Sequence, residues 1–145
     1  MKTFCLIGAG GFASEVYCLL TDLGKSTQTE CFMETSPSKE SFMGLPVKPI
    51  SSFDPDKNIA VICVGDPVQK QTLIRQLPKN TEFETLIHPT VIMSKFVEVG
   101  IGSIICAGSI LTCNIKLGKF VHLNLNTTVG HDCVIGDYAT TAPAV

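Results

Sequence analysis

A six-residue repeat runs from Ile87 to the end of the chain and constrains its fold more than any other feature. At six-residue intervals from Ile87, nine of ten residues are aliphatic or methionine, and a small or polar residue follows each position. An amphipathic helix needs a hydrophobic period of about 3.6 residues and a half-buried strand a period of about two. A strict period of six is instead typical of a hexapeptide β-helix. The ten positions are Ile87, Met93, Val99, Ile105, Leu111, Leu117, Leu123, Val129, Ile135 and Thr141.

The period also predicts how the repeats stack. Three hexads form one triangular coil of about 18 residues (3 × 6), the aliphatic residue fills the interior, and the small residue after it lets the chain turn the corner. Adjacent coils lie about 4.8 Å apart, the spacing of neighbouring strands. We therefore predict that residues eighteen positions apart stack on adjacent coils, with Cys113 beside His131 and His122 beside Thr140.

The first 85 residues show a different pattern, in which short strands alternate with helices. Apolar runs at 3–7, 29–33 and 59–64 predict strands, and an amphipathic stretch ends at Gly24. A second helix is predicted over 67–77, with Asp66 as its N-cap and Pro67 in its first turn. Residues 34–46 are polar and rich in turn formers. Alternation of this kind favours a parallel sheet with right-handed crossovers, so we predict domains at 1–85 and 86–145.

A glycine motif follows the first predicted strand. Gly8, Gly10 and Ala13 match the G-x-G-x-x-[GA] pattern, and Glu34 lies 21 residues after Ala13. In a dinucleotide site such glycines admit a phosphate at a helix N-terminus, and the acidic residue accepts a hydrogen bond from a ribose hydroxyl. The same glycines also occur where a helix merely packs closely on a strand, and the motif by itself does not separate the two interpretations.

Composition excludes several classes of protein. Eleven Lys and Arg residues against thirteen Asp and Glu residues leave a formal charge of −2, which argues against a nucleic-acid partner. No apolar run has the length of a membrane span. Seven cysteines form no C-x-x-C pair or zinc-ligand spacing, so we expect reduced thiols, no metal and a cytoplasmic location.

With these features in place, the whole chain resembles the NeuD/PglD-like sugar acetyltransferases of bacteria. The motifs that carry the resemblance are GAGGFASEV, GLPV, ICVGDP, LIHPTV and LNLNTTVGHDCVIGDYATTAP. The resemblance implies a small Rossmann-like domain that binds a nucleotide-sugar, followed by a left-handed β-helix that binds acetyl-CoA. The hexads of this chain amount to about three coils of such a β-helix. It also implies a homotrimer with active sites between subunits, and either an activated amino sugar or sialic acid as substrate.

Site residues carry over from the resemblance one by one. His131 of the GHDC motif matches the family's general base, Asp132 the acidic neighbour that orients it, and Asn124 an active-site asparagine. Nucleotide-sugar binding is expected at the glycine loop, at the acidic position after the second strand and at a polar patch beyond the third strand; the residues are Gly8, Gly10, Gly11, Glu34, Asp66 and Lys70.

The chemistry of His131 is consistent with that role. Acetyl transfer from a thioester needs a base to take a proton from the attacking amine or hydroxyl, and imidazole titrates near neutral pH. A neighbouring carboxylate fixes its tautomer and stabilises the imidazolium. His131 is the third residue of its hexad, a phase that faces outward.

Three functions remain open from the sequence. Relatives continue for several coils beyond the position that matches Val145, so we expect a truncated chain with an incomplete β-helix and an incomplete acetyl-CoA site. The first function is a sugar N- or O-acetyltransferase, and the second is a nucleotide-sugar-binding module without catalysis. The third is an NAD-binding oxidoreductase domain, which the glycine motif supports but the hexad repeat does not.

Overall fold

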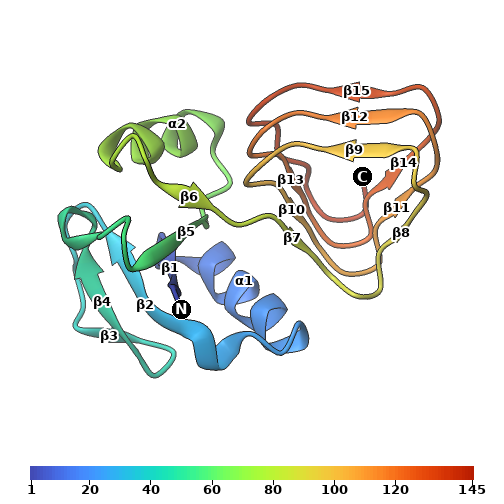
Figure 1. Ribbon diagram of the computed structural model, residues 1–145. Helices are drawn as coiled ribbons and strands as arrows, with labels where there is room; N and C mark the ends of the chain where they lie inside the picture. Colours follow the sequence, from blue (N-terminus) through green and yellow to red (C-terminus); the bar gives the residue numbers. More distant parts are fainter. The chain divides into compact units, whose positions relative to one another are not determined.

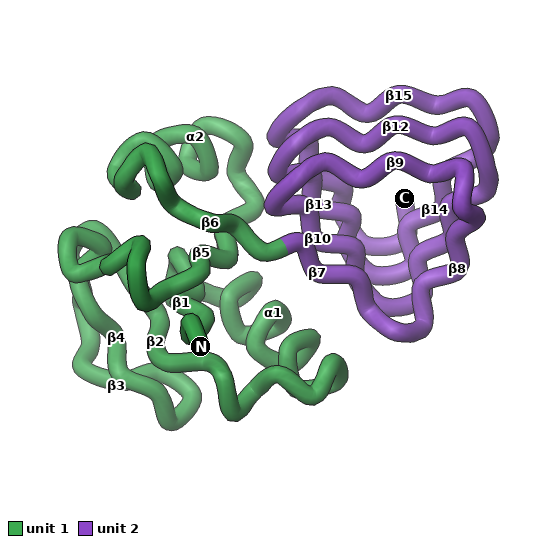
Figure 2. The backbone as a smooth tube through the Cα atoms, viewed as in Figure 1, with its two compact units in different colours: residues 1–84 green, residues 85–145 purple.

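A computed structural model describes residues 1–145, which divide into two compact units, Met1–Glu84 and Thr85–Val145 (Figure 2). None of the helices has both the length and the apolar character needed to cross a bilayer. Each unit is described separately below.

The first unit is built on a six-stranded sheet in the order β3-β4-β2-β1-β5-β6 (Figure 1). All neighbouring pairs are parallel except β3 and β4, which form an antiparallel hairpin. The predicted parallel sheet of Rossmann-like type is thus confirmed. The strands are β1 (Thr3–Ile7), β2 (Thr29–Glu34), β3 (Ser41–Phe42), β4 (Leu45–Pro49), β5 (Asn58–Ile62) and β6 (Glu82–Phe83).

Two helices and two 3-10 turns connect these strands. Helix α1 spans Gly11–Asp22 and α2 spans Pro67–Gln76, and the 3-10 turns are η1 (Ser26–Gln28) and η2 (Ile50–Ser52). Asp66 caps α2 and Pro67 occupies its first turn, as the sequence predicts. The hairpin of β3 and β4 lies partly within residues 34–46, which the sequence analysis described as polar and rich in turn formers. Val47 is the one buried residue of β4, so this strand lacks the apolar run that marks a buried strand. Its prolines are tolerated because it lies near the edge of the sheet.

The second unit consists of nine short strands in three parallel sheets of three strands each. Strands within a sheet pair residues eighteen positions apart, as in Ile104 with Leu86 and with His122, so the predicted stacking register is confirmed. An isolated bridge from His122 to Thr140 continues it. The strands are β7 (Leu86–Ile87), β8 (Ile92–Met93), β9 (Val97–Val99), β10 (Ile104–Ile105), β11 (Ile110–Leu111), β12 (Ile115–Leu117), β13 (His122–Leu123), β14 (Thr128–Val129) and β15 (Val134–Ile135).

The β-helix interior is filled as the repeat predicts. The aliphatic positions form one buried cluster, in which Ile105, Leu111 and Leu123 have almost no exposed surface. The residue two positions earlier, such as Val121, points into the same cluster because side chains two apart on a strand share a face. The large residues of the nine hexads from Ile87 to Ile135 therefore supply the core.

The corners differ from the sequence expectation in one respect. The small residue after each aliphatic was expected to allow the turn, but the left-handed backbone conformation occurs two positions later. The small residue instead permits close stacking, since a Cβ on Gly100 would collide with the carbonyl oxygen of Gly118. Glycine, asparagine and aspartate adopt positive φ most readily, and they fill most of the turning positions: Gly102, Gly108, Asn114, Phe120, Asn126, Asp132, Tyr138 and Ala144.

Candidate active site

The glycine loop after β1 forms one candidate site, in the first unit. Gly8 has φ +125°, and a Cβ there would lie 3.0 Å from the carbonyl oxygen of Cys63 and 3.0 Å from Val64 Cγ1. Its amide donates to the carbonyl of Met33 at 2.7 Å. Only glycine suits this position, because both the backbone conformation and the available space exclude a side chain.

The neighbouring glycines have a different role. A Cβ on Gly10 or Gly11 would meet nothing within 4 Å, and neither has a positive φ. Gly10 is the N-cap of α1, and no side chain caps this helix. The space in front of a helix N-terminus is therefore open at the point where an anionic group is most favoured.

A cavity of about 300 Å³ lies at the carboxyl ends of β1, β2 and β5. Strand order reverses between β1 and β5, and open α/β sheets bind ligands at such a switch point. Glu34 lines the cavity, and its Oε1 is a buried oxygen with no hydrogen-bond partner. An acceptor of this kind suits a ligand hydroxyl. The lining residues are Gly8, Ala9, Gly10, Met33, Glu34, Thr35, Val64, Gln69 and Leu73.

Two residues near the cavity were missed by the sequence analysis. Lys39 Nζ donates to the carbonyl oxygen of Ala9 at 2.7 Å and lies 4.1 Å from the ring centroid of Phe42, which places a cation beside the glycine loop. Gln69, from the first turn of α2, lines the cavity. Lys39 lies in the turn-rich segment after β2, where no motif distinguished it.

The predicted polar patch of Asp66 and Lys70 does not line this cavity. Asp66 Oδ1 accepts hydrogen bonds from the amides of Val68 and Gln69, both at 2.9 Å, and so serves as the cap of α2. Lys70 is fully buried, and burial lowers the pKa of its ammonium group to about 8. Their part in sugar-nucleotide binding stays a prediction.

The second candidate site lies on a corner of the β-helix, between β14 and β15. His131 Nδ1 and Asp132 Oδ2 are 2.7 Å apart, and both side chains are well exposed, at 78% and 66%. Asp132 has φ +64°, the turning conformation of the corner, and its amide donates to the carbonyl of Cys113 at 3.2 Å. The backbone of the repeat thus holds the carboxylate beside the imidazole.

A third side chain completes this constellation. Asn114 occupies the equivalent corner position one coil earlier and hydrogen bonds to the Asp132 carboxylate. The hydrogen bond from His131, and then that from Asn114, lower the pKa of Asp132 below its ordinary value. An ionised Asp132 favours the tautomer in which His131 carries its proton on Nδ1, which leaves Nε2 as an acceptor. In this arrangement Nε2 of His131 is the nitrogen that can accept a proton.

A groove of about 290 Å³ lies on the same corner and includes Asn114 in its wall. Lys95 and Lys116 supply positive charge, and Lys95 Nζ lies 5.2 Å from the ring centroid of the exposed Phe96. Phe96, Asn114 and Asp132 follow one another at intervals of eighteen residues on this corner. The other lining residues are Glu98 and Ile115.

Asn124 lies on a different corner of the β-helix, between β13 and β14. Its side-chain Oδ1 accepts a hydrogen bond from the backbone amide of Leu125 at 2.8 Å, and its backbone amide donates to Thr141 Oγ1 at 3.0 Å. Within one chain the structure therefore does not bring Asn124 to the corner of His131 and Asp132. Its predicted place in an active site stays a prediction.

Taken together, a Rossmann-like unit with a glycine loop and a β-helix with a corner His–Asp pair define a two-domain protein of the hexapeptide-repeat class. No family profile matches the chain. The chain is 26% identical, over 99% of its own length and 68% of the relative, to GDP-perosamine N-acetyltransferase of Escherichia coli O157:H7.

Solved structures share this fold. WeeI from Acinetobacter baumannii AYE is 32% identical, with a TM-score of 0.88 over 99% of this chain and 70% of that protein. PerB from Caulobacter crescentus, solved in complex with CoA and GDP-perosamine, is 22% identical, with a TM-score of 0.86 over 99% of this chain and 70% of that protein. The chain belongs to the NeuD/PglD-like family of sugar acetyltransferases, and so to the transferase class of enzymes.

Proposed function

We propose that this protein transfers the acetyl group of acetyl-CoA to the amino group of a nucleotide-activated amino sugar. The observation that carries the proposal is the exposed pair of His131 and Asp132, held at 2.7 Å on a β-helix corner and supported by Asn114. The E. coli relative is named as an N-acetyltransferase of GDP-perosamine, and PerB was solved with CoA and that sugar nucleotide. Sialic acid, the other substrate class suggested by the sequence, has no such support.

His131 is the general base in this proposal. Its Nε2 accepts a proton from the amino nitrogen as that nitrogen forms a bond to the acetyl carbon and the carbon–sulfur bond of the thioester breaks. The imidazolium then returns the proton to the leaving thiolate, so the charges balance. Asp132 remains ionised and stabilises the imidazolium without taking its proton. Asn114 holds the carboxylate in its orientation.

The groove beside the pair suits acetyl-CoA, which supplies the activated acetyl thioester. Lys95 and Lys116 would hold phosphate groups of the coenzyme, and the exposed Phe96 offers an apolar face to its organic part. The groove shares Asn114 with the catalytic pair, so a thioester bound there lies close to His131. These side chains fit an anionic, partly apolar ligand.

The nucleotide part of the sugar substrate is assigned to the glycine loop of the first unit. Gly10 and the start of α1 would receive the diphosphate, with Lys39 as a counter-charge, and the buried Oε1 of Glu34 would accept a hydrogen bond from a ribose hydroxyl. Gly11 belongs to the same loop.

The remaining expectations extend this proposal. The left hand of the β-helix follows from the family resemblance, and its length of about three coils follows from the ten hexads. A cytoplasmic enzyme is consistent with the seven unpaired cysteines, which suit a reducing compartment. A homotrimer is supported by apolar side chains on the outward faces of the coils: Ile92, Ile110 and Val134 are 66%, 38% and 77% exposed. Sedimentation analysis tests the trimer directly.

The experiment that tests the function is an acetyl-transfer assay with a panel of amino-sugar nucleotides. Release of the CoA thiol is followed with wild type, His131→Ala and Asp132→Asn. We expect His131→Ala to lower turnover by ~10² to 10⁴ and Asp132→Asn to lower it less. Thermal-shift titration with acetyl-CoA, sugar nucleotides, sialic acid and NAD separates the alternatives. Stabilisation by sugar nucleotides without turnover means a binding module, and stabilisation by NAD alone an oxidoreductase domain.

A further inference from the structure

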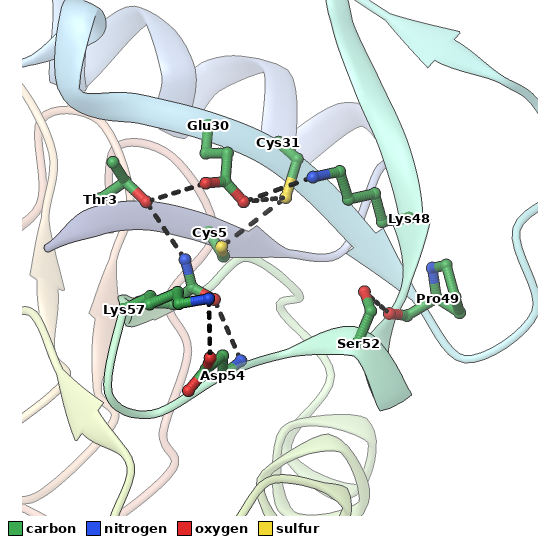
Figure 3. A network of polar contacts seen from close by, with 10 residues as sticks. Thr3, Cys5, Glu30, Cys31, Lys48, Pro49, Ser52, Asp54 and Lys57 are labelled. Atoms are coloured by element: carbon green, nitrogen blue, oxygen red, sulfur yellow. Dashed lines mark hydrogen bonds and ion pairs between the residues drawn. The ribbon is translucent and has the colours of Figure 1, made fainter.

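A pair of buried thiols lies in the middle of β1 and β2. Cys5 and Cys31 are directly opposed in the register of these parallel strands, and their sulfur atoms are 3.6 Å apart (Figure 3). Neither residue has exposed surface. Neither takes part in the proposed acetyl transfer.

A β-bulge brings a carboxylate to the same place. Phe4 pairs with Thr29 and the next residue, Cys5, pairs with Cys31, so Glu30 is the extra residue of β2. A bulge interrupts the alternation of side chains and re-aims one of them. Glu30 accordingly lies on the side of Cys31 although the two are adjacent in sequence. Its Oε2 is 4.0 Å from Cys31 Sγ, and one atom from each of the three residues lies within 4.8 Å of the others.

Further polar side chains fix the orientation of this carboxylate (Figure 3). Thr3 Oγ1 donates to Glu30 Oε1 at 3.2 Å, and Asn58 Nδ2 donates to Thr3 Oγ1 at 3.1 Å. Lys48 Nζ, from β4, pairs with Glu30 Oε2 at 3.4 Å. Four strands thus contribute to holding one carboxylate beside two thiols, an arrangement typical of the groups that orient metal ligands.

We propose that Cys5, Cys31 and Glu30 form a binding site for a thiophilic divalent cation, with Zn²⁺ as the representative ion. Zinc–sulfur bonds of about 2.3 Å in a tetrahedron place two sulfur atoms about 3.8 Å apart. The observed 3.6 Å is close to that separation. Three protein ligands leave the fourth position of the tetrahedron to water.

The charges of the cluster balance with a divalent ion. Two thiolates and the Glu30 carboxylate carry three negative charges, Lys48 carries one positive charge, and the cation supplies two. On binding, two metal–sulfur bonds replace two S–H bonds and both protons leave to solvent, with no change of oxidation state.

The charged groups lie on the more exposed side of the cluster. The side chains of Glu30 and Lys48 are 39% and 42% exposed, whereas the two sulfur atoms lie beneath them. A hydrated ion meets the carboxylate first and the thiols second. The cluster has no sequence signature, because its ligands come from two strands and only the pairing of β1 with β2 joins them.

Cobalt titration of the full, reduced protein without a histidine tag tests the proposal. Co²⁺ bound by thiolate gives sulfur-to-metal charge-transfer absorption, which carboxylate or imidazole ligands do not. The variants are Cys5→Ser, Cys31→Ser and Glu30→Gln, with Cys63→Ala as the matched control because Cys63 is also a buried thiol of this unit. Thermal melts of every variant establish that it is folded.

We expect one Co²⁺ per chain with the charge-transfer band, displacement by Zn²⁺, loss of the band in both serine variants and no change in Cys63→Ala. Glu30→Gln keeps the buried residues intact and should weaken binding about 10- to 100-fold. Absence of the band in wild type would overturn the proposal. So would a band that survives both serine variants, or unchanged affinity in a folded Glu30→Gln protein. Because the readout is metal binding, it is independent of the acetyl-transfer assay.

Discussion

Asn114 and Asp132 are eighteen residues apart, occupy equivalent corners of adjacent coils, and share a hydrogen bond that, after the one from His131, lowers the pKa of the Asp132 carboxyl. Both have a positive φ, so the same backbone conformation that turns the corner also directs the two side chains at each other. In the proposed mechanism this bond orients the carboxylate that partners His131.

Asn114→Ala should therefore lower turnover by roughly 3- to 10-fold, with little effect on the KM for the sugar nucleotide, because orientation of the base is lost while the base remains. Asn126→Ala is the control, since Asn126 has the same left-handed conformation on another corner. Both variants lose about 1 kcal/mol of stability to backbone strain. Equal turnover in the two variants would show that Asn114 acts only through the fold. The measurement is steady-state kinetics with parallel melts.

The two glycines of the nucleotide loop should respond differently to alanine. Gly8→Ala forces a side chain into a left-handed position already occupied by Cys63 and Val64, so we expect a loss of stability of about 2 kcal/mol or more. Gly10→Ala meets no atom and should leave the melting temperature unchanged, but its methyl group occupies the space in front of α1. It should raise the Kd for a sugar nucleotide at least tenfold by calorimetry. Unchanged affinity of Gly10→Ala would argue against phosphate binding at this loop.

Buried Lys70 predicts a pH dependence of stability. Its pKa in the folded chain is about 8, against 10.5 for an ordinary lysine. Between these values the unfolded chain binds more protons than the folded one, so the free energy of unfolding rises with pH across this window. The rise is at most about 3 kcal/mol. Urea melts between pH 7.5 and pH 10.5 measure it. Lys70→Met should flatten the profile; an equal slope in wild type and variant would contradict the assignment.

The corner that carries Gly102 tests the packing of the β-helix. Phe120 occupies the space beside Gly102 and stacks on Tyr138, with ring centroids 5.9 Å apart and parallel planes. Gly102→Ala should cost about 1 to 3 kcal/mol, because the new methyl group collides with the Phe120 ring. Gly130→Ala, where a Cβ meets nothing within 4 Å, should be nearly neutral. Chemical denaturation compares the two variants.

The sequence by itself determined the elements whose signal is local or periodic. The hexad repeat predicted the core and the eighteen-residue register, because each coil repeats the packing of the one before. The glycine motif predicted the loop after β1, because the backbone conformation at Gly8 is one that glycine adopts readily. The pair of His131 and Asp132 could also be predicted from the sequence, because the two residues are adjacent in it.

Only the tertiary structure decided which distant side chains meet. Lys39 reaches the glycine loop across thirty residues, Lys70 is buried and does not line the cavity, and Asn124 lies on another corner from His131. The thiol cluster depends on a single bulged residue, Glu30, which no pattern of hydrophobicity reveals. Such contacts depend on strand register and side-chain direction, and a shift of one residue reverses the face on which a side chain lies. Periodicity fixes the backbone path, but only the assembled sheet and coils fix the chemistry between strands.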